Sequence, residues 1–326
     1  MTRQLVESGG QLIEVVSALP WVSRLIEEAA QGELRVASPG AMPSVVVRIE
    51  GVRDAFDLRG FDVLTRGAWQ REGEAILHDV CTSGFDLHVA PRPGQVTFRF
   101  RWRPPLRSRA AAWALPTRFR LLVRAVLLQY PALWWAGVSG LAPLHVSACI
   151  AGAARPLLAG PSGVGKSTLV SHELRAGGRA TCDNLGVADG TSVWGVVEPL
   201  RLEHAIGRPT THGRHEVRMR GRLPCLVPDR VVVVRRGLQE LPFVRSCDST
   251  TATRSLVTGT YMAGELRRYW SLAATLASAT GAGPAHPPVA EVAAQFANRL
   301  PCFELVLGRR PRASLADLLQ RLESIA

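Results

Sequence analysis

The feature that most constrains this chain is the segment 157–170, LLAGPSGVGKSTLV. It contains the pattern G-x-x-x-x-G-K-[ST], whose fixed positions are occupied by Gly160, Gly165, Lys166 and Ser167. A short apolar run that ends in glycine precedes the pattern, and a stretch with helical spacing follows it. This order predicts a strand, a phosphate-binding loop and a helix.

Lys166 is the only lysine of the chain; Lys and Arg together number 39, so the other 38 basic residues are arginine. A lysine carries a compact charge on a thin stem that reaches the β and γ phosphates, a path that the wide guanidinium group does not fit. Glycines let successive N–H groups point at phosphate oxygens, and the helix adds its positive end. We therefore predict that ATP is bound by Gly160, Pro161, Ser162, Gly163, Val164, Gly165, Lys166, Ser167 and Thr168. A chance match is the alternative.

A loop of this kind also needs a carboxylate for the magnesium ion that bridges the phosphates. Asp183, in ATCDNLG, lies 16 residues beyond Ser167 at the end of the next strand-like run. We expect Ser167 and Asp183 to hold Mg²⁺ between them. The alternative for Asp183 is an ordinary turn aspartate.

The composition is that of a globular protein: 47% of the 326 residues are hydrophobic, 20% are charged, and no low-complexity tract is present. The net charge of +12 implies an anionic partner, and nucleotides, phosphorylated substrates, acidic peptides, nucleic acid and anionic membranes all qualify. The six cysteines are scattered without zinc-ligand spacing, and the N-terminal segment has charges and glycines where a signal peptide needs an apolar core. These features predict a reduced, cytoplasmic protein.

The first third of the chain differs from the rest. Residues 11–31 have helical spacing, and SVVVRIE, FDLHVA and QVTFRFRW read as strands, followed by a connector from Arg103. We predict an α+β accessory domain over 1–110 and a P-loop domain over 111–326, in the α/β class. The apolar window 125–144 is interrupted by Gln129, Pro131 and Pro143, which favours a buried helix over a membrane span.

Several further elements are expected in the second domain. A helix spans about 118–135, and the loop region forms a βαβ unit with parallel strands. DRVVVVRRG and CFELVLG are strands, AGELRRYWSLAATLASATG is a long helix, and SLADLLQRLESIA is a helix capped by Ser314.

The stretch LHVSACIAGAARPLLAGPSGVGKSTLVSHELRAGGRATCDNL resembles the core of HPr kinase/phosphorylase and its relatives, which share a fold with phosphoenolpyruvate carboxykinase. In that family a histidine lies 15 residues before the first glycine of the loop, the spacing of His145 and Gly160. Asp183 matches the first of two family aspartates, and Asn184 replaces the second. The resemblance covers about 60 residues, from His145 to about Arg201.

The resemblance implies an ATP-dependent kinase that transfers the γ-phosphoryl group to a hydroxyl, on a peptide serine or a small molecule, with His145 beside the acceptor. The sequence looks most like kinases found with ribosomally made peptide natural products, including lasso peptides. The signature loop that this family uses for the phosphate-dependent reverse reaction is not recognisable in this sequence, so phosphorylase activity is not expected. Relatives form rings, so the resemblance allows a homo-oligomer, although the sequence itself shows no interface. Because Asn184 removes a carboxylate, the general base stays open between His145 and another acid.

Each of the remaining candidate site residues also has an interpretation without a function. Glu198 is a candidate second metal carboxylate or a solvated turn residue, and Arg214 is a candidate cation for the moving phosphoryl group or part of a solvated charged face. One of Arg267 and Arg268 is a candidate for the nucleotide, although solvated arginines beside packed aromatic residues are favoured. The basic segment 99–109 is a candidate for an acidic leader peptide; no nucleic-acid motif is present, and we expect no nucleic-acid partner.

Two further functions stay open. A nucleotide-binding regulator or scaffold with a degenerate kinase site is consistent with Asn184, and nucleic-acid binding is consistent with the basic surface. A transporter-type ATPase is disfavoured, because its LSGGQ-like signature and the glutamate after its metal aspartate are missing.

Overall fold

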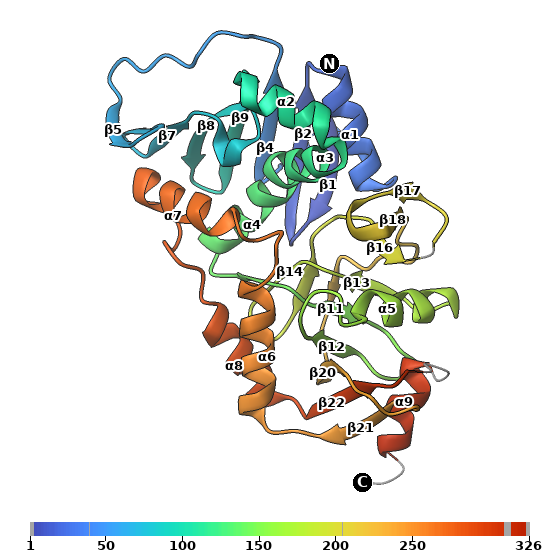
Figure 1. Ribbon diagram of the computed structural model, residues 1–326. Helices are drawn as coiled ribbons and strands as arrows, with labels where there is room; N and C mark the ends of the chain where they lie inside the picture. Colours follow the sequence, from blue (N-terminus) through green and yellow to red (C-terminus); the bar gives the residue numbers. More distant parts are fainter. Residues whose placement is uncertain (1–2, 39, 204, 310–313, 324–326) are drawn as a thin grey trace.

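The computed structural model describes residues 3–38, 40–203, 205–309 and 314–323 and shows a mixed α/β chain with several sheets (Figure 1). The N-terminal strands form a sheet that has nine strands within these residues, in the order β3-β1-β2-β4-β9-β8-β7-β6-β5. They are β1 (Gln4–Ser8), β2 (Gln11–Ser17), β3 (Arg35–Val36), β4 (Val45–Glu50), β5 (Asp62–Thr65), β6 (Ala68–Arg71), β7 (Glu74–Leu77), β8 (Phe85–Arg92) and β9 (Gln95–Trp102). A short 3-10 turn, η1 (Val80–Thr82), precedes β8.

The predicted helix over 11–31 is wrong in its first half. Gly9 and Gly10, both with positive φ (59° and 72°), close a two-residue turn, so residues 11–17 pair with β1 as a strand. The helix α1 (Pro20–Ala30) then crosses over, and β4 lies parallel to β2. The three strands predicted from SVVVRIE, FDLHVA and QVTFRFRW are confirmed at β4, β8 and β9.

The helical region after this sheet packs against it. It comprises α2 (Leu106–Ala114), where a connector was expected, then α3 (Pro116–Arg124), the π-helical turn η2 (Ala125–Gln129) and α4 (Tyr130–Val138). The continuous helix 116–138 is long and apolar enough to span a membrane, but 83% of its apolar window is buried inside the protein. The prediction of a buried helix is confirmed.

The second half of the chain is built on a sheet with six strands within the described ranges, in the order β13-β11-β12-β20-β22-β21. Its strands are β11 (Ser147–Cys149), β12 (Pro156–Ala159), β13 (Ala180–Cys182), β20 (Arg230–Arg236), β21 (Phe243–Ser246) and β22 (Cys302–Leu307). β12, β20 and β22 are parallel neighbours. β12 and β13 also run parallel, as expected, but β11 lies between them and is antiparallel to both. The carboxyl ends of these parallel strands therefore meet at one edge.

Helices cover both faces of this sheet, which gives two apolar cores (Figure 1). α6 (Ser249–Tyr261) and α8 (Val289–Arg299) contribute to one core, and α5 (Lys166–Arg175) and α9 (Leu315–Glu323) lie on the other side. The predicted cap of α9 is confirmed, because the Asp317 N–H donates to Ser314 Oγ at 3.0 Å. The long helix predicted from residue 263 begins only at Tyr269, as α7 (Tyr269–Thr280).

Two small sheets complete the fold. One contains β10 (Ala142–Leu144), β14 (Gly186–Ala188), β15 (Val193–Gly195) and β19 (Cys225–Leu226), and the other contains β16 (Leu200–Glu203), β17 (Arg208–Pro209) and β18 (Arg214–Val217), with the turn η3 (Thr211–Gly213) before β18. α7 packs on β6 and β7, so a late segment contributes to the N-terminal core, which also continues into residues 123–136. The domain division at residue 110 stays a prediction.

Candidate phosphate-binding site

The glycine-rich loop connects β12 to α5, and its three glycines have conformations that other residues rarely adopt. The φ angles are 145° at Gly160, 80° at Gly163 and 120° at Gly165. A Cβ at Gly160 would lie 2.8 Å from the carbonyl oxygen of Val234 in the adjacent β20. Glycine is therefore required for the close approach of the two backbones. The loop leads directly into the first turn of α5, where backbone N–H groups lack intrahelical partners.

A pocket opens where this loop meets the carboxyl ends of the strands. It is lined by His145, Ser162, Gly163, Gly165, Lys166, Ser167, Thr168, Asp183, Asn184, Arg201, Glu203, Arg214 and Arg236. Most of the residues predicted from the sequence thus lie together. Among the described residues, four predicted ones do not line this pocket: Gly160, Pro161, Val164 and Glu198. Val164 packs in the core beneath the loop, and Glu198 lies behind Asn184.

The ammonium group of Lys166 is held against its own loop. Nζ donates to the carbonyl oxygens of Gly160 at 2.6 Å and Pro161 at 3.2 Å, and the residue is only 5% exposed. Burial lowers the pKa of Lys166 to about 8, although the Asp183 and Glu265 carboxylates favour the charged form. The site therefore holds a poorly solvated cation, which an anion can stabilise.

Asp183 follows β13 and is 3% exposed. Its carbonyl oxygen accepts from Ser147 Oγ at 2.5 Å, and its carboxylate accepts from the same hydroxyl at 3.3 Å. Burial raises the pKa of the Asp183 carboxyl to about 6; the hydrogen bond from Ser167 opposes this, and the nearby Glu198 adds to it. No ion pair neutralises this carboxylate within the described ranges.

Ser167 and Asp183 fit a magnesium ion. Mg²⁺ takes oxygen ligands and usually keeps waters and substrate phosphates in its shell, so one hydroxyl and one carboxylate suffice from the protein. A buried carboxylate without a cationic partner, hydrogen-bonded to a hydroxyl at the helix start, is a donor set of this kind. No group of three or more His, Cys, Asp or Glu that would suit a metal cage is found in the part of the chain that the structure describes.

His145 lies between β10 and β11 and lines the same pocket, 2% exposed. Its backbone N–H donates to Thr260 Oγ1 at 3.0 Å, whereas its ring Nδ1 is buried without a hydrogen-bond partner. Burial, together with the neighbouring Lys166 cation, lowers the pKa of His145 to about 4. The ring is therefore neutral at physiological pH.

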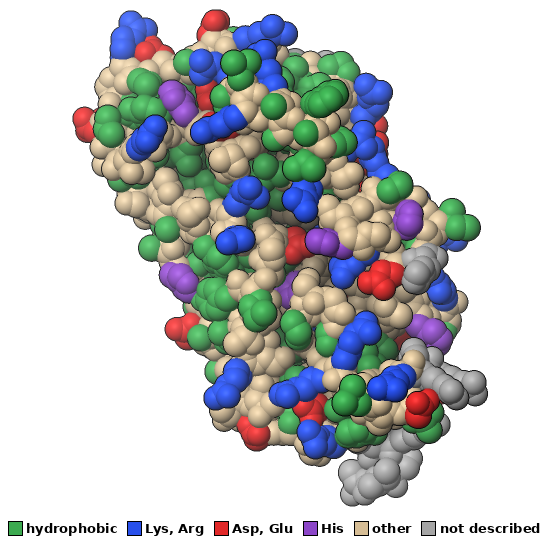
Figure 2. Space-filling model, in the orientation of Figure 1, with side chains coloured by type: hydrophobic (Ala, Val, Ile, Leu, Met, Phe, Trp, Pro, Cys, Tyr) green, Lys and Arg blue, Asp and Glu red, His purple; other side chains and the backbone are tan. Residues whose placement is uncertain are grey.

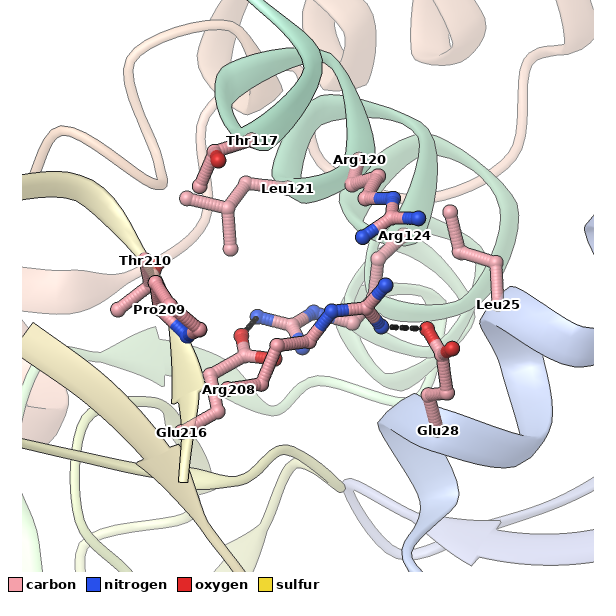
Figure 3. Close-up of a pocket in the computed structure, with 10 residues that line it drawn as sticks. All are labelled: Leu25, Glu28, Thr117, Arg120, Leu121, Arg124, Arg208, Pro209, Thr210 and Glu216. Carbon is pink, nitrogen blue, oxygen red and sulfur yellow. Dashed lines mark hydrogen bonds and ion pairs between the residues drawn. The ribbon is translucent and has the colours of Figure 1, made fainter. Parts of the chain in front are cut away.

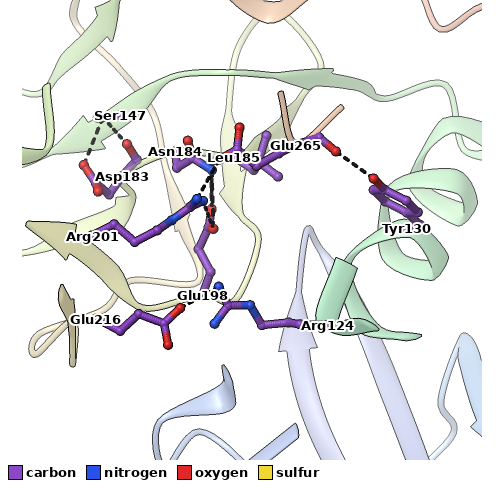
Figure 4. A network of polar contacts seen from close by, with 10 residues as sticks. All are labelled: Arg124, Tyr130, Ser147, Asp183, Asn184, Leu185, Glu198, Arg201, Glu216 and Glu265. Atoms are coloured by element: carbon purple, nitrogen blue, oxygen red, sulfur yellow. Dashed lines mark hydrogen bonds and ion pairs between the residues drawn. The ribbon is translucent and has the colours of Figure 1, made fainter. Parts of the chain in front are cut away.

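Behind the pocket lies a buried chain of polar contacts (Figure 4). Asn184 Nδ2 donates to both carboxylate oxygens of Glu198, at 3.2 and 3.3 Å, and the Leu185 N–H donates to the same group at 3.1 Å. Arg201 bridges Glu198 at 3.1 Å and Glu265 at 2.6 Å. Glu198 would have to exchange these contacts to bind a metal, so its metal role stays a prediction.

Two arginines border the loop from different strands. Arg214, predicted from the sequence, begins β18 and also lies 3.9 Å from Glu203; a Cβ at Gly163 would be 3.5 Å from its guanidinium. Arg236 was missed, although its Nη2 donates to the Gly163 carbonyl oxygen at 3.5 Å. It ends the buried strand β20, and its place at the carboxyl end of a strand parallel to β12 is the signal that would have found it.

Arg267 and Arg268 are solvent-exposed and precede α7 rather than lie within a helix. Neither lines the pocket at the loop, in the part of the chain that the structure covers. Arg268 lines a second, adjoining cavity instead.

No family model and no curated protein matches the sequence. Of the 35 chains of solved structures that match, one is the HPr(Ser) kinase/phosphatase from Coxiella burnetii. It is 12% identical, the match covers 56% of this chain and 88% of that one, and the TM-score is 0.29. A TM-score of this size carries no residue role from that protein to this one.

Proposed function

We propose that this chain is an ATP-dependent, HPr kinase-like kinase that transfers the γ-phosphoryl group of Mg-ATP to a hydroxyl, on a peptide serine or a small molecule. The observation that carries the proposal is the convergence of Lys166, Ser167 and Asp183 in one pocket, directly after a glycine loop and at the carboxyl edge of the parallel strands. Phosphoryl transfer depends mainly on positioning and charge stabilisation, which such a site supplies.

The reaction assigns a role to each side chain. The acceptor oxygen bonds to the γ phosphorus as the bond from that phosphorus to the bridging oxygen breaks, so ADP leaves and the acceptor proton must go to a base. Lys166 holds the β and γ phosphates with the loop N–H groups, and Arg214 balances the charge on the moving group. Ser167 and Asp183 would hold a magnesium ion, which would supply positive charge that stabilises the phosphates.

The base for the acceptor proton stays open between His145 and another acid, because Asp183 is assigned to the magnesium ion. The pKa of His145 near 4 makes its ring a weak proton acceptor. The free Nδ1 of His145 accepts a hydrogen bond from the acceptor hydroxyl and orients it.

Nucleotide binding and turnover test the proposal separately. A fluorescent ATP analogue with Mg²⁺ should bind the wild-type protein and the Arg175→Met variant, since Arg175 is an exposed residue at the end of the same helix, but not Lys166→Met. Equal affinity of Lys166→Met and wild type would refute the phosphate-binding role. ADP formation, with a panel of serine peptides and hydroxy compounds as acceptors, then tests transfer.

A nucleotide-binding regulator or scaffold is the second candidate, and Asn184 favours it. This residue lies in the pocket where a second carboxylate would assist the chemistry, and its amide is used to hold Glu198. Tight Mg-ATP binding without acceptor-dependent ADP formation would support the regulator and exclude the kinase.

A further inference from the structure

A second cavity adjoins the phosphate-binding pocket and shares Ser162, Arg201 and Arg214 with it. It has about 1350 Å³ of empty space, part of it open to solvent, between the helical segment formed by α3, η2 and the start of α4, the turn η3 and the segment before α7. Its lining residues are Arg118, Leu121, Leu122, Arg124, Ala125, Gln129, Tyr130, Ser162, Arg201, Thr211, His212, Arg214, Gly264, Glu265 and Arg268. Figure 2 shows Lys and Arg side chains gathered over the middle of this face, between the N-terminal sheet and the P-loop sheet.

The unpaired charge at this cavity is positive. Arg124 is bound to Glu216 at 2.8 Å, and Arg201 neutralises Glu265, the carboxylate that lines the cavity. By contrast, Arg118 and Arg268 have no hydrogen-bond or ion-pair partner for their guanidinium groups within the residues that the structure describes. Two free guanidinium groups at the mouth of a concave site are complementary to carboxylate or phosphate.

Gln129 offers a neutral hydrogen-bonding group to the same cavity. The residue as a whole is 3% exposed, but its amide atoms are not fully buried and face the open space that the residue lines. It ends the π-helical turn η2, a distortion that is frequent at functional sites. A ligand with a hydrogen-bonding group can replace water at this amide.

The neighbouring hollow is less suited to an anion (Figure 3). It lies between α1, α3 and the small sheet formed by β16, β17 and β18, and it shares Leu121 and Arg124 with the cavity. Its Arg208 pairs with Glu28 and its Arg124 pairs with Glu216, so among the described residues only Arg120 of its three arginines lacks a carboxylate partner, against both Arg118 and Arg268 in the cavity.

We propose that the cavity is the acceptor site and selects a hydroxyl compound that carries a carboxylate or phosphate group, bound by Arg118 and Arg268 with Gln129 as a hydrogen-bonding partner. This proposal rests on the proposed kinase function. The residues shared between the two pockets place the acceptor hydroxyl beside the end of the phosphate chain. A small hydroxy acid and an acidic peptide carry the same chemistry, and the cavity volume accommodates either.

The test measures binding to the full chain saturated with Mg-ADP, by calorimetry. The anionic probes are 3-phosphoglycerate and a serine peptide flanked by aspartates, and the neutral counterparts are glycerol and the same peptide flanked by asparagines. We expect one anionic probe to bind at least about tenfold more tightly than its neutral counterpart, since a hydrogen bond to a charged group is worth about that factor or more. Whichever probe binds identifies a small acid or a peptide as the source of the anion.

Variants assign that preference to the cavity. Arg118→Gln and Arg268→Gln should each lower the preference about tenfold, Arg118→Lys and Arg268→Lys should retain part of it, and the exposed Arg175→Gln should leave it unchanged. The affinity for Mg-ATP should change less than about twofold in all of them.

The outcomes separate this inference from the proposed function. No preference of the wild type for either anionic probe, or a preference unaffected by the cavity variants, overturns the inference and leaves nucleotide binding intact. Loss of Mg-ATP affinity in Arg118→Gln and Arg268→Gln also overturns it, because the cavity would then hold the nucleotide. Anion binding in a protein that does not bind Mg-ATP would overturn the proposed function instead.

Discussion

Replacement of Lys166 by methionine should make the protein more stable and unable to bind nucleotide. Burial lowers the pKa of Lys166 from its usual 10.5 to about 8. Folding therefore costs the ammonium form about 3 kcal/mol more than it would cost the neutral amine, since one pKa unit is worth ~1.36 kcal/mol, and at neutral pH the group is charged in both the folded and the unfolded chain. Methionine retains an unbranched chain of similar length without this charge.

Part of that gain is lost with the two hydrogen bonds to the carbonyl oxygens of Gly160 and Pro161, each worth about 0.5–1.5 kcal/mol. We expect Lys166→Met to raise the free energy of unfolding by about 1–2 kcal/mol in the absence of nucleotide. Mg-ATP at a hundred times its dissociation constant should stabilise the wild type by about 2.7 kcal/mol and the variant not at all.

Urea unfolding with and without Mg-ATP measures both effects. Arg175→Met is the matched control, because Arg175 is exposed on the same helix; its stability should stay within about 0.5 kcal/mol of wild type, with the full nucleotide effect. The unfolded chain binds more protons at Lys166 between pH 8 and 10.5, so this residue makes wild-type stability rise with pH over that window, and the rise should be absent in Lys166→Met. A variant less stable than wild type by more than about 1 kcal/mol would refute the reasoning.

Three further results are expected. Bound phosphates should raise the pKa of Lys166 again, so the binding of Mg-ATP near pH 8 should be accompanied by proton uptake. Calorimetry in buffers of different ionisation enthalpy measures this uptake. Its absence would mean that the ammonium group does not contact the phosphates. Asn184→Asp would place a carboxylate where an amide now lies 3.2 Å from the Glu198 carboxylate, so the free energy of unfolding at pH 7 should fall by about 1–3 kcal/mol. Stability should partly recover at pH 5, where one of the two carboxylates can take up a proton. Equal stability of variant and wild type at both pH values would contradict this. Asp248 caps α6, because its carboxylate accepts a hydrogen bond from the Thr251 N–H at 2.7 Å. Asp248→Ala should lower the free energy of unfolding in urea by about 1 kcal/mol without changing the affinity for Mg-ATP.

Local patterns in the sequence were sufficient for much of the fold. The run VVVV predicted β20, because a strand that is buried on both faces has a continuous run of apolar residues. Helical spacing after Lys166 predicted α5, because a helix that is buried on one face has apolar residues at every third or fourth position. The same reasoning failed over residues 11–17, where helical spacing was read across a hairpin that the two preceding glycines create. The cytoplasmic location, the homo-oligomer and the absence of a nucleic-acid partner stay predictions.

For the candidate site, the sequence by itself determined the loop, since a tight phosphate-binding turn needs glycines, one lysine and one hydroxyl at fixed spacing in a continuous segment. Only the tertiary structure decided what surrounds it. Arg236 reaches the loop from β20, and Gln129 and Arg268 line the second cavity from segments that are far apart in the chain. Arg236 at least ends a strand that the sequence predicts, but no local pattern marks Gln129 or Arg268, because their proximity depends on how the strands and helices pack.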